Sequence, residues 1–171
     1  METGTVIFIV AISILLTGSI VYIVTTRMKM ANGHNNGADE KNNPSLSLKL
    51  QAYERLMILV DRIALPNVIS RLNNPSLSAR EMQAVLTQEI RSEFEYNITQ
   101  QIYVSPEAWN AVKNLKDQNI LTINQLAAVL PPAAIAKDLN KLLLEFLMND
   151  RKGNLHEVVA EALTYEAGKL M

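Results

Sequence analysis

The chain has no cysteine, and this absence removes several kinds of chemistry at once. Without a thiol there is no disulfide framework, no thiolate nucleophile and no thiolate metal site. An excess of one charge is also missing, because 16 Lys and Arg stand against 17 Asp and Glu, for a net charge of −1. A nucleic-acid-binding protein needs a basic surface to neutralise phosphates, so we expect no nucleic acid partner.

Motifs for catalysis and for cofactor binding are missing as well. The run HEVVA at 156–160 begins like a zinc-peptidase helix, but alanine occupies the position of the second metal ligand. Gly168–Lys169 lacks the flanking residues of a phosphate-binding loop. Glu89 and Glu93 are one helical turn apart without the histidine spacing of di-iron bundles, so we interpret them as a solvated face. We therefore predict no catalytic residue, no cofactor and no metal.

A long hydrophobic run is present near the N-terminus. The sequence from Thr5 to Val24 carries no charge, and a helix of that length spans about 30 Å of hydrocarbon. A cleavable signal peptide is the alternative, but it would need a basic start, a shorter apolar run and a cleavage site with small residues. Glu2 is the only charged residue before the run. We therefore predict a retained transmembrane helix, with the lipid bilayer as partner of residues 5–24.

Basic residues predict how this helix is oriented. Arg27 and Lys29 follow the hydrophobic run, and no basic residue precedes it. The positive-inside rule then places the C-terminal side in the cytoplasm and the N-terminus outside. Residues 1–30 are predicted to be a single-pass anchor in the inner (cytoplasmic) membrane.

The remaining sequence predicts a linker and a helical domain. Residues 31–44 are rich in Asn and Gly without apolar periodicity, which is typical of a flexible linker. Residues 45–171 show helical periodicity and no alternating run long enough for a strand. The expected fold class is all-α: one N-terminal transmembrane helix, a flexible linker and a compact cytoplasmic bundle of about five helices.

Local signals divide this domain into helices. Capping patterns mark helix starts, prolines and glycines mark helix ends, and apolar spacing marks the inward faces. The predicted helices are Leu46–Leu65, ended by Pro66 and followed by a short segment at 68–72; one opened by a capping box at Ser78; one capped by Ser105; a short one from Thr122 to Leu130; Ala133–Asn149; and one capped by Asn154. The predicted inward-facing residues include Leu56, Val85, Ile98, Ile135, Val158 and Ala162.

Two stretches of this domain resemble a known group of proteins. These are LKLQAYERLMILVDRI at 48–63 and EIRSEFEYNITQQIYVSPEAWNAVKNLK at 89–116. They are similar to an uncharacterised family of short, single-span bacterial membrane proteins, and the resemblance covers nearly the whole chain. The resemblance implies the same architecture. Since that family has no assigned activity, it implies no functional residue.

The second of these stretches concentrates polar and aromatic side chains. Tyr96, Gln100, Tyr103 and Trp109 lie near a predicted helix junction, with further amides between them. Tyr and Trp are favoured anchors of protein interfaces, so these four are our predicted partner-binding residues. The alternative is that they cap and pack the junction.

Two functions follow from these expectations. The first is a non-enzymatic, membrane-tethered interaction or scaffold module, such as an accessory subunit of a membrane complex, whose partner is another protein or a second copy of the chain. The second is a small-molecule-binding or enzymatic helical domain at the membrane surface, with its pocket near Tyr96–Trp109.

Overall fold

The computed structural model describes residues 44–149 and 155–171. The predicted membrane helix at 5–24 and the linker at 31–43 lie outside these residues. Among the helices of the described part, none combines the length and the apolar character that crossing a bilayer requires. The described residues are all-α, with six α-helices and a short 3₁₀ helix: α2 (Pro44–Ile63), α3 (Leu65–Leu72), α4 (Ala79–Tyr96), η2 (Ile98–Ile102), α5 (Pro106–Ala128), α6 (Ala136–Asn149) and α7 (Leu155–Gly168).

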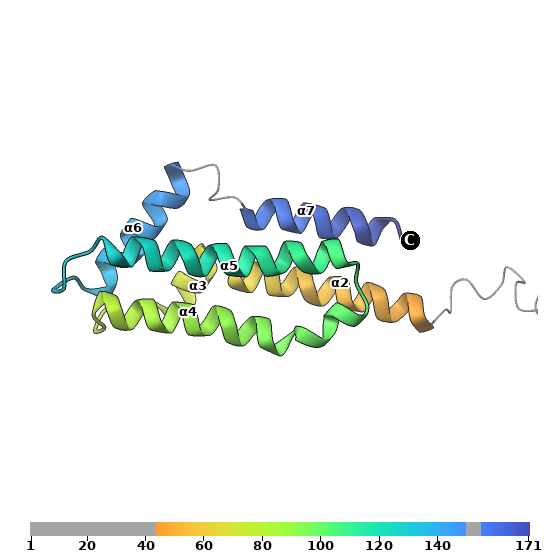
Figure 1. Cartoon of the computed structure of the whole chain (residues 1–171), viewed down its shortest axis with the longest axis horizontal. Coiled ribbons are helices and arrows are strands. Elements are labelled where there is room, and N and C mark those ends of the chain that lie inside the picture. The colour runs from red at the N-terminus through yellow and green to blue at the C-terminus, as the bar shows by residue number, and fades with distance from the viewer. Residues whose placement is uncertain (1–43, 150–154) are drawn as a thin grey trace, which may run out of the picture. The chain divides into compact units, whose positions relative to one another are not determined.

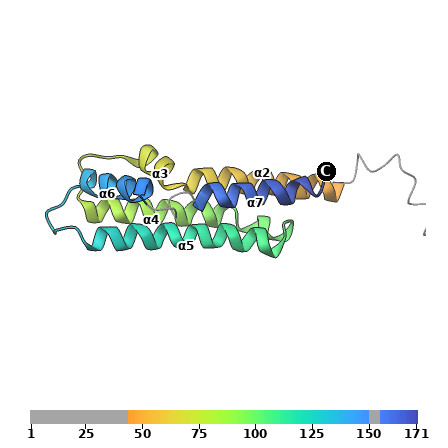
Figure 2. The ribbon, with the colours of Figure 1, turned by 90° about the horizontal axis from the view of Figure 1, so that it is seen from above.

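The helices of the unit Pro44–Met171 pack around one hydrophobic core. Figures 1 and 2 both show α2 beside α7 and α4 beside α5, while α6 packs against the α4–α5 pair. Burial of large apolar side chains is the main driving force for this arrangement. The largest fully buried side chains are Leu56, Leu59, Val60, Ile63, Met82, Leu86, Ile90, Leu115, Ile123, Leu139, Leu143 and Leu163.

The predicted helix Leu46–Leu65 ends two residues earlier, at Ile63, and the predicted short segment at 68–72 is part of the helix α3. Proline has no N–H and its ring clashes with the preceding turn, so Pro66 ends α2 and occupies the first turn of α3. Pro44, the last residue of the predicted linker, is the first residue of α2. The bundle of Pro44–Met171 therefore has six α-helices in its described residues, where about five were predicted.

The break between α2 and α3 frees backbone carbonyls, and side chains satisfy them. The carbonyl of Asp61 accepts from Asn67 Nδ2 at 2.9 Å. The carbonyl of Arg62 accepts from Arg71 Nη1 at 3.0 Å, and that of Ile63 accepts from Asn119 Nδ2 at 2.8 Å. Only the bond from Asn119 to Ile63 is buried, and an unpaired buried carbonyl is costly, so this bond contributes most to holding the break between α2 and α3.

The predicted capping box at Ser78 is confirmed. Its hydroxyl accepts from the backbone N–H of Glu81, and the Glu81 carboxylate accepts from the backbone N–H of Ser78 at 2.8 Å. The backbone hydrogen bond from Ser78 lowers the pKa of Glu81, since it stabilises the charged carboxylate. Antiparallel pairing with Ile135 then joins the start of α4 to the start of α6.

The predicted cap at Ser105 is also confirmed, but the separate helix from Thr122 is wrong. α5 is continuous from Pro106 to Ala128. A capping pattern starts a helix only where the preceding helix has ended, and nothing between Lys116 and Thr122 breaks a helix. The buried residue Asn119 lies in the middle of α5.

Five side chains predicted to face inward are exposed: Val85, Ile98, Ile135, Val158 and Ala162. Each lies beside a buried neighbour on the same helix or turn, so apolar spacing located the buried face but overestimated its width. Single exposed apolar residues are common on protein surfaces.

Candidate functional site

The four predicted partner-binding residues lie on the segment from the end of α4 through η2 to the start of α5, but they do not share one surface. Tyr96 is 74% exposed and Tyr103 is 39% exposed. Gln100 is only 8% exposed, and Trp109 is half-buried against the core. The two tyrosines are therefore accessible to a partner, whereas Gln100 offers it little surface.

Trp109 packs at the junction of α4 and α5, in agreement with the alternative prediction that these side chains cap and pack the junction. Its ring lies 5.0 Å from the ring of Phe94 at an angle of 33°. The ammonium of Lys116 lies 4.7 Å from the centre of the same Phe94 ring. Aromatic pairing and the cation–π contact both stabilise the helix packing. Trp109 therefore has a structural role.

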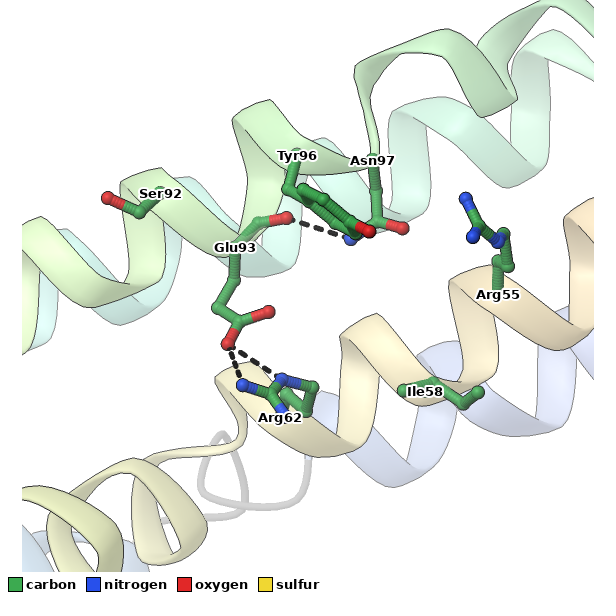
Figure 3. Close-up of a pocket in the computed structure, with 7 residues that line it drawn as sticks. All are labelled: Arg55, Ile58, Arg62, Ser92, Glu93, Tyr96 and Asn97. Carbon is green, nitrogen blue, oxygen red and sulfur yellow. Dashed lines mark hydrogen bonds and ion pairs between the residues drawn. The ribbon is translucent and has the colours of Figure 1, made fainter.

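A groove lies between α2 and α4, with Tyr96 at its edge. It is a pocket of about 500 Å³, which we call the α2/α4 groove. Figure 3 shows three side chains from α2 facing the gap on one side and Tyr96 with its α4 neighbours on the other. The lining residues are Arg55, Ile58, Arg62, Ser92, Glu93, Tyr96 and Asn97.

The position of these residues follows from helix geometry. Arg55, Ile58 and Arg62 are spaced three and four residues apart, so they lie on one face of α2. Glu93 and Tyr96 are likewise three residues apart on α4. The α2/α4 groove is therefore formed by two helix faces that meet only in the folded chain.

One end of the groove is closed by ion pairs. Arg62 donates two hydrogen bonds to Glu93 Oε1, one of them from Nε at 2.6 Å. Arg71 of α3 pairs with Glu89 at 2.9 Å and lies 3.8 Å from Glu93. The Glu93 carboxylate raises the pKa of Arg62 through these hydrogen bonds.

This network corrects the interpretation of Glu89 and Glu93 as a solvated face. Both carboxylates have arginine partners from other helices, and the Glu93 side chain is only 12% exposed. The sequence could not show this, because their partners are distant in the chain.

The other end of the groove is open. Ile58 is 59% exposed next to Tyr96 on the opposite helix. Figure 3 shows the guanidinium of Arg55 facing the gap toward the end of α4. Within residues 44–149 and 155–171, no hydrogen bond or ion pair is formed by the Arg55 side chain. This end therefore presents an aliphatic, an aromatic and a cationic group.

A second polar cluster includes Tyr53 of α2, and its polar groups are paired with one another. The Tyr53 hydroxyl accepts from the backbone N–H of Ser105 at 3.2 Å and donates to Glu166 Oε2 at 2.8 Å. Ser105 Oγ also donates to Glu166 Oε2 and accepts from the backbone N–H of Ala108 at 3.0 Å. Burial raises the pKa of Tyr53, and the Glu166 carboxylate adds to this effect. These contacts join α2, α5 and α7.

No group of three or more His, Asp or Glu within residues 44–149 and 155–171 is placed to hold a metal ion. The side chain of His156 is half-buried in the first turn of α7 and does not line the α2/α4 groove.

The comparison with protein families covers nearly all of the chain. A family of unknown function, DUF7935, matches residues 2–170. The chain belongs to the DUF7935 family. The predicted resemblance to an uncharacterised family is thereby confirmed. No curated protein and no solved structure matches this DUF7935 chain.

Sequence reasoning identified one residue of the open end and missed two. Tyr96 is one of the predicted partner-binding residues, whereas Arg55 and Ile58 fall within the predicted helix Leu46–Leu65 without a predicted role. The available signal was an isoleucine between two arginines at helical spacing. This spacing indicates a binding surface only together with the structure, which places that face of α2 opposite Tyr96.

Proposed function

We propose that this DUF7935 protein is a non-enzymatic, membrane-tethered interaction or scaffold module that binds a protein partner in the α2/α4 groove. One observation carries the proposal: Ile58 and Tyr96 remain exposed on facing helices, next to the unpaired side chain of Arg55. Burial of such apolar surface by a partner is favourable. Tyr and Arg are also enriched among residues that dominate binding energy.

The shape of the site supports a protein partner. Arg62 and Glu93 close one end and hold it in place by their ion pair. The partner then meets a groove whose walls are helices, and helices position side chains more accurately than loops do. A partner segment that lies along the groove would contact both α2 and α4.

The membrane part of the proposal rests on the uncharged run from Thr5 to Val24 and on the basic residues after it. Anchoring raises the local concentration of the domain near membrane partners. A reporter fused after Met171 tests the orientation. We expect a cytoplasmic signal, and an extracytoplasmic signal would reverse the proposed topology.

Affinity purification of the full chain from detergent extracts tests the proposed function. We expect Tyr96→Ala to reduce recovery of a specific partner at least about tenfold, as loss of an interface anchor does. Tyr165→Ala is the matched control, because Tyr165 is 68% exposed but lies on α7 outside the groove. Equal recovery with both variants, or recovery of the protein alone, contradicts the proposal. A second copy as partner would appear as a dimer in light scattering.

A second candidate function is small-molecule binding, and a different pocket favours it. A cavity of about 300 Å³ lies between α5, α6 and α7, where Phe146, Leu147 and Leu155 provide apolar surface and Asn119 and His156 provide polar groups. Apolar cavities with a few polar groups are typical ligand sites. Thermal-shift screening with a fragment collection tests this candidate, since a ligand that binds only the folded state raises the unfolding temperature.

A further inference from the structure

The chemistry of the open end specifies what kind of partner fits, if the groove is the binding site of the proposed function. We propose that the α2/α4 groove binds a peptide segment that carries a carboxylate next to an apolar side chain. The carboxylate pairs with the guanidinium of Arg55. The apolar side chain covers Ile58 and the ring of Tyr96.

Charge complementarity selects the carboxylate. Arg62 and Arg71 already have carboxylate partners in Glu93 and Glu89, whereas Arg55 has none within the described residues. The planar guanidinium matches a carboxylate with two parallel hydrogen bonds. A cationic side chain at the same place would be repelled. The unpaired charge of the groove is therefore positive.

Helix geometry sets the spacing of the two groups in the partner. Arg55 and Ile58 are three residues apart, and such neighbours have Cβ atoms about 5–6 Å apart on a helix surface. The partner must present its carboxylate and its apolar side chain at a similar separation. Residues three or four apart on a helix have this separation, and residues two apart on an extended strand have nearly the same.

A peptide fits better than the other source of negative charge, an anionic membrane surface. The concave space between α2 and α4 suits a single peptide segment better than a flat bilayer surface does.

A peptide selection with the full chain in mild detergent tests the inference. The immobilised chain selects from a displayed library of random ten-residue peptides, and wild type is compared with Arg55→Glu, Tyr96→Ala and Arg80→Glu. Arg80 is the matched control, because it is exposed on α4 away from the groove. We expect wild type and Arg80→Glu to enrich peptides with Asp or Glu near a large apolar residue.

Arg55→Glu provides a readout that loss of folding cannot imitate. We expect it to select Lys or Arg in place of the acid while the apolar preference persists, because only the charge of the groove is reversed. Tyr96→Ala should lose the apolar preference. For one enriched acidic peptide, replacing the acid by its amide should weaken binding to wild type about fivefold, as for a partly exposed ion pair.

The remaining outcomes separate this inference from the proposed function. Selection of peptides that depend on Tyr96 but show no acidic preference overturns the inference and leaves the proposed function standing. Failure to select any peptide that depends on Tyr96 or Arg55 counts against both. Binding to vesicles of phosphatidylglycerol that Arg55→Glu abolishes, without peptide selection, overturns the inference in favour of a membrane surface.

Discussion

Tyr53 and Arg55 are two residues apart on α2, yet their surroundings differ completely. Tyr53 is 5% exposed, and its hydroxyl has both a donor and an acceptor in the cluster with Ser105 and Glu166. Arg55 points into the α2/α4 groove without a partner in the described residues. Polar groups that are buried must be paired, whereas exposed ones need not be. The comparison separates the face of α2 that stabilises the fold from the face available for binding.

The contrast extends to the apolar residues next to them. Leu56 is fully buried, and Ile58 is mostly exposed. Substitutions on the two faces should therefore have opposite consequences. On the buried face of Leu56 they should reduce stability strongly and affect binding little. On the groove face of Ile58 they should reduce binding and affect stability little. Substitutions on either face can break this separation, and the largest effect is expected in the core.

Leu56→Ala should cause the largest loss of stability. It leaves a cavity in the core, and such substitutions reduce the free energy of unfolding by about 2–5 kcal/mol. Ile58→Ala is the matched substitution on the groove face and should change the free energy of unfolding by less than about 0.5 kcal/mol. Chemical denaturation of the full chain, followed by circular dichroism, measures both. Similar losses for the two variants would mean that Ile58 belongs to the core.

Glu166→Ala should cause the next largest loss. It removes the acceptor shared by the buried Tyr53 hydroxyl and the Ser105 hydroxyl, and unsatisfied buried donors cost about 1–3 kcal/mol each. Glu166→Gln retains an acceptor oxygen and should lose less. Glu161→Ala on the exposed side of α7 is the control and should have little effect. If the two alanine variants are equally stable, the cluster does not hold α7 in place.

These two faces also show how much could be predicted from the sequence. The caps Ser78 and Ser105 were predictable because a cap is a local signal within four residues of the chain. The inward position of Leu56 followed from apolar spacing. The ion pairs of Glu93 and the hydrogen bond between Tyr53 and Glu166 were not predictable, because each joins helices whose relative rotation depends on the whole core.

The candidate site was predictable only in part, for the same reason. Tyr96 was recognised by residue type, and Gln100 was grouped with it although its side chain is buried. Residue type indicates which side chains could bind a partner, but burial decides which are accessible. Arg55 entered the site because α2 and α4 meet at that point.

Tyr53→Phe should reduce stability by about 1 kcal/mol near neutral pH, since it removes one hydroxyl from a paired position. Its effect should depend on pH. Burial raises the pKa of Tyr53 above 10.0, so its stabilising contribution is complete below pH 10 and is lost as pH rises through the native pKa.

The difference between wild type and Tyr53→Phe should therefore shrink as the pH rises above about 10. Urea denaturation at a series of pH values measures it. Tyr165→Phe removes an exposed hydroxyl and corrects for general alkaline effects. A difference that stays constant over this range would show that the Tyr53 hydroxyl is not protected from ionisation by the fold.

Arg55→Gln should have the smallest effect on stability, within about 0.5 kcal/mol, because its side chain makes no hydrogen bond or ion pair in the described residues. Arg62→Gln at the closed end of the groove is the matched comparison. It breaks a partly exposed ion pair with Glu93, and such pairs contribute about 0.2–1 kcal/mol. Salt screens the ion pair, so it should reduce the difference in stability between wild type and Arg62→Gln. It should leave the difference between wild type and Arg55→Gln unchanged. Denaturation at low and high salt measures the two differences. If Arg55→Gln instead destabilises the chain as much as Arg62→Gln, then Arg55 has a structural partner and the open end of the groove is not free to bind a carboxylate.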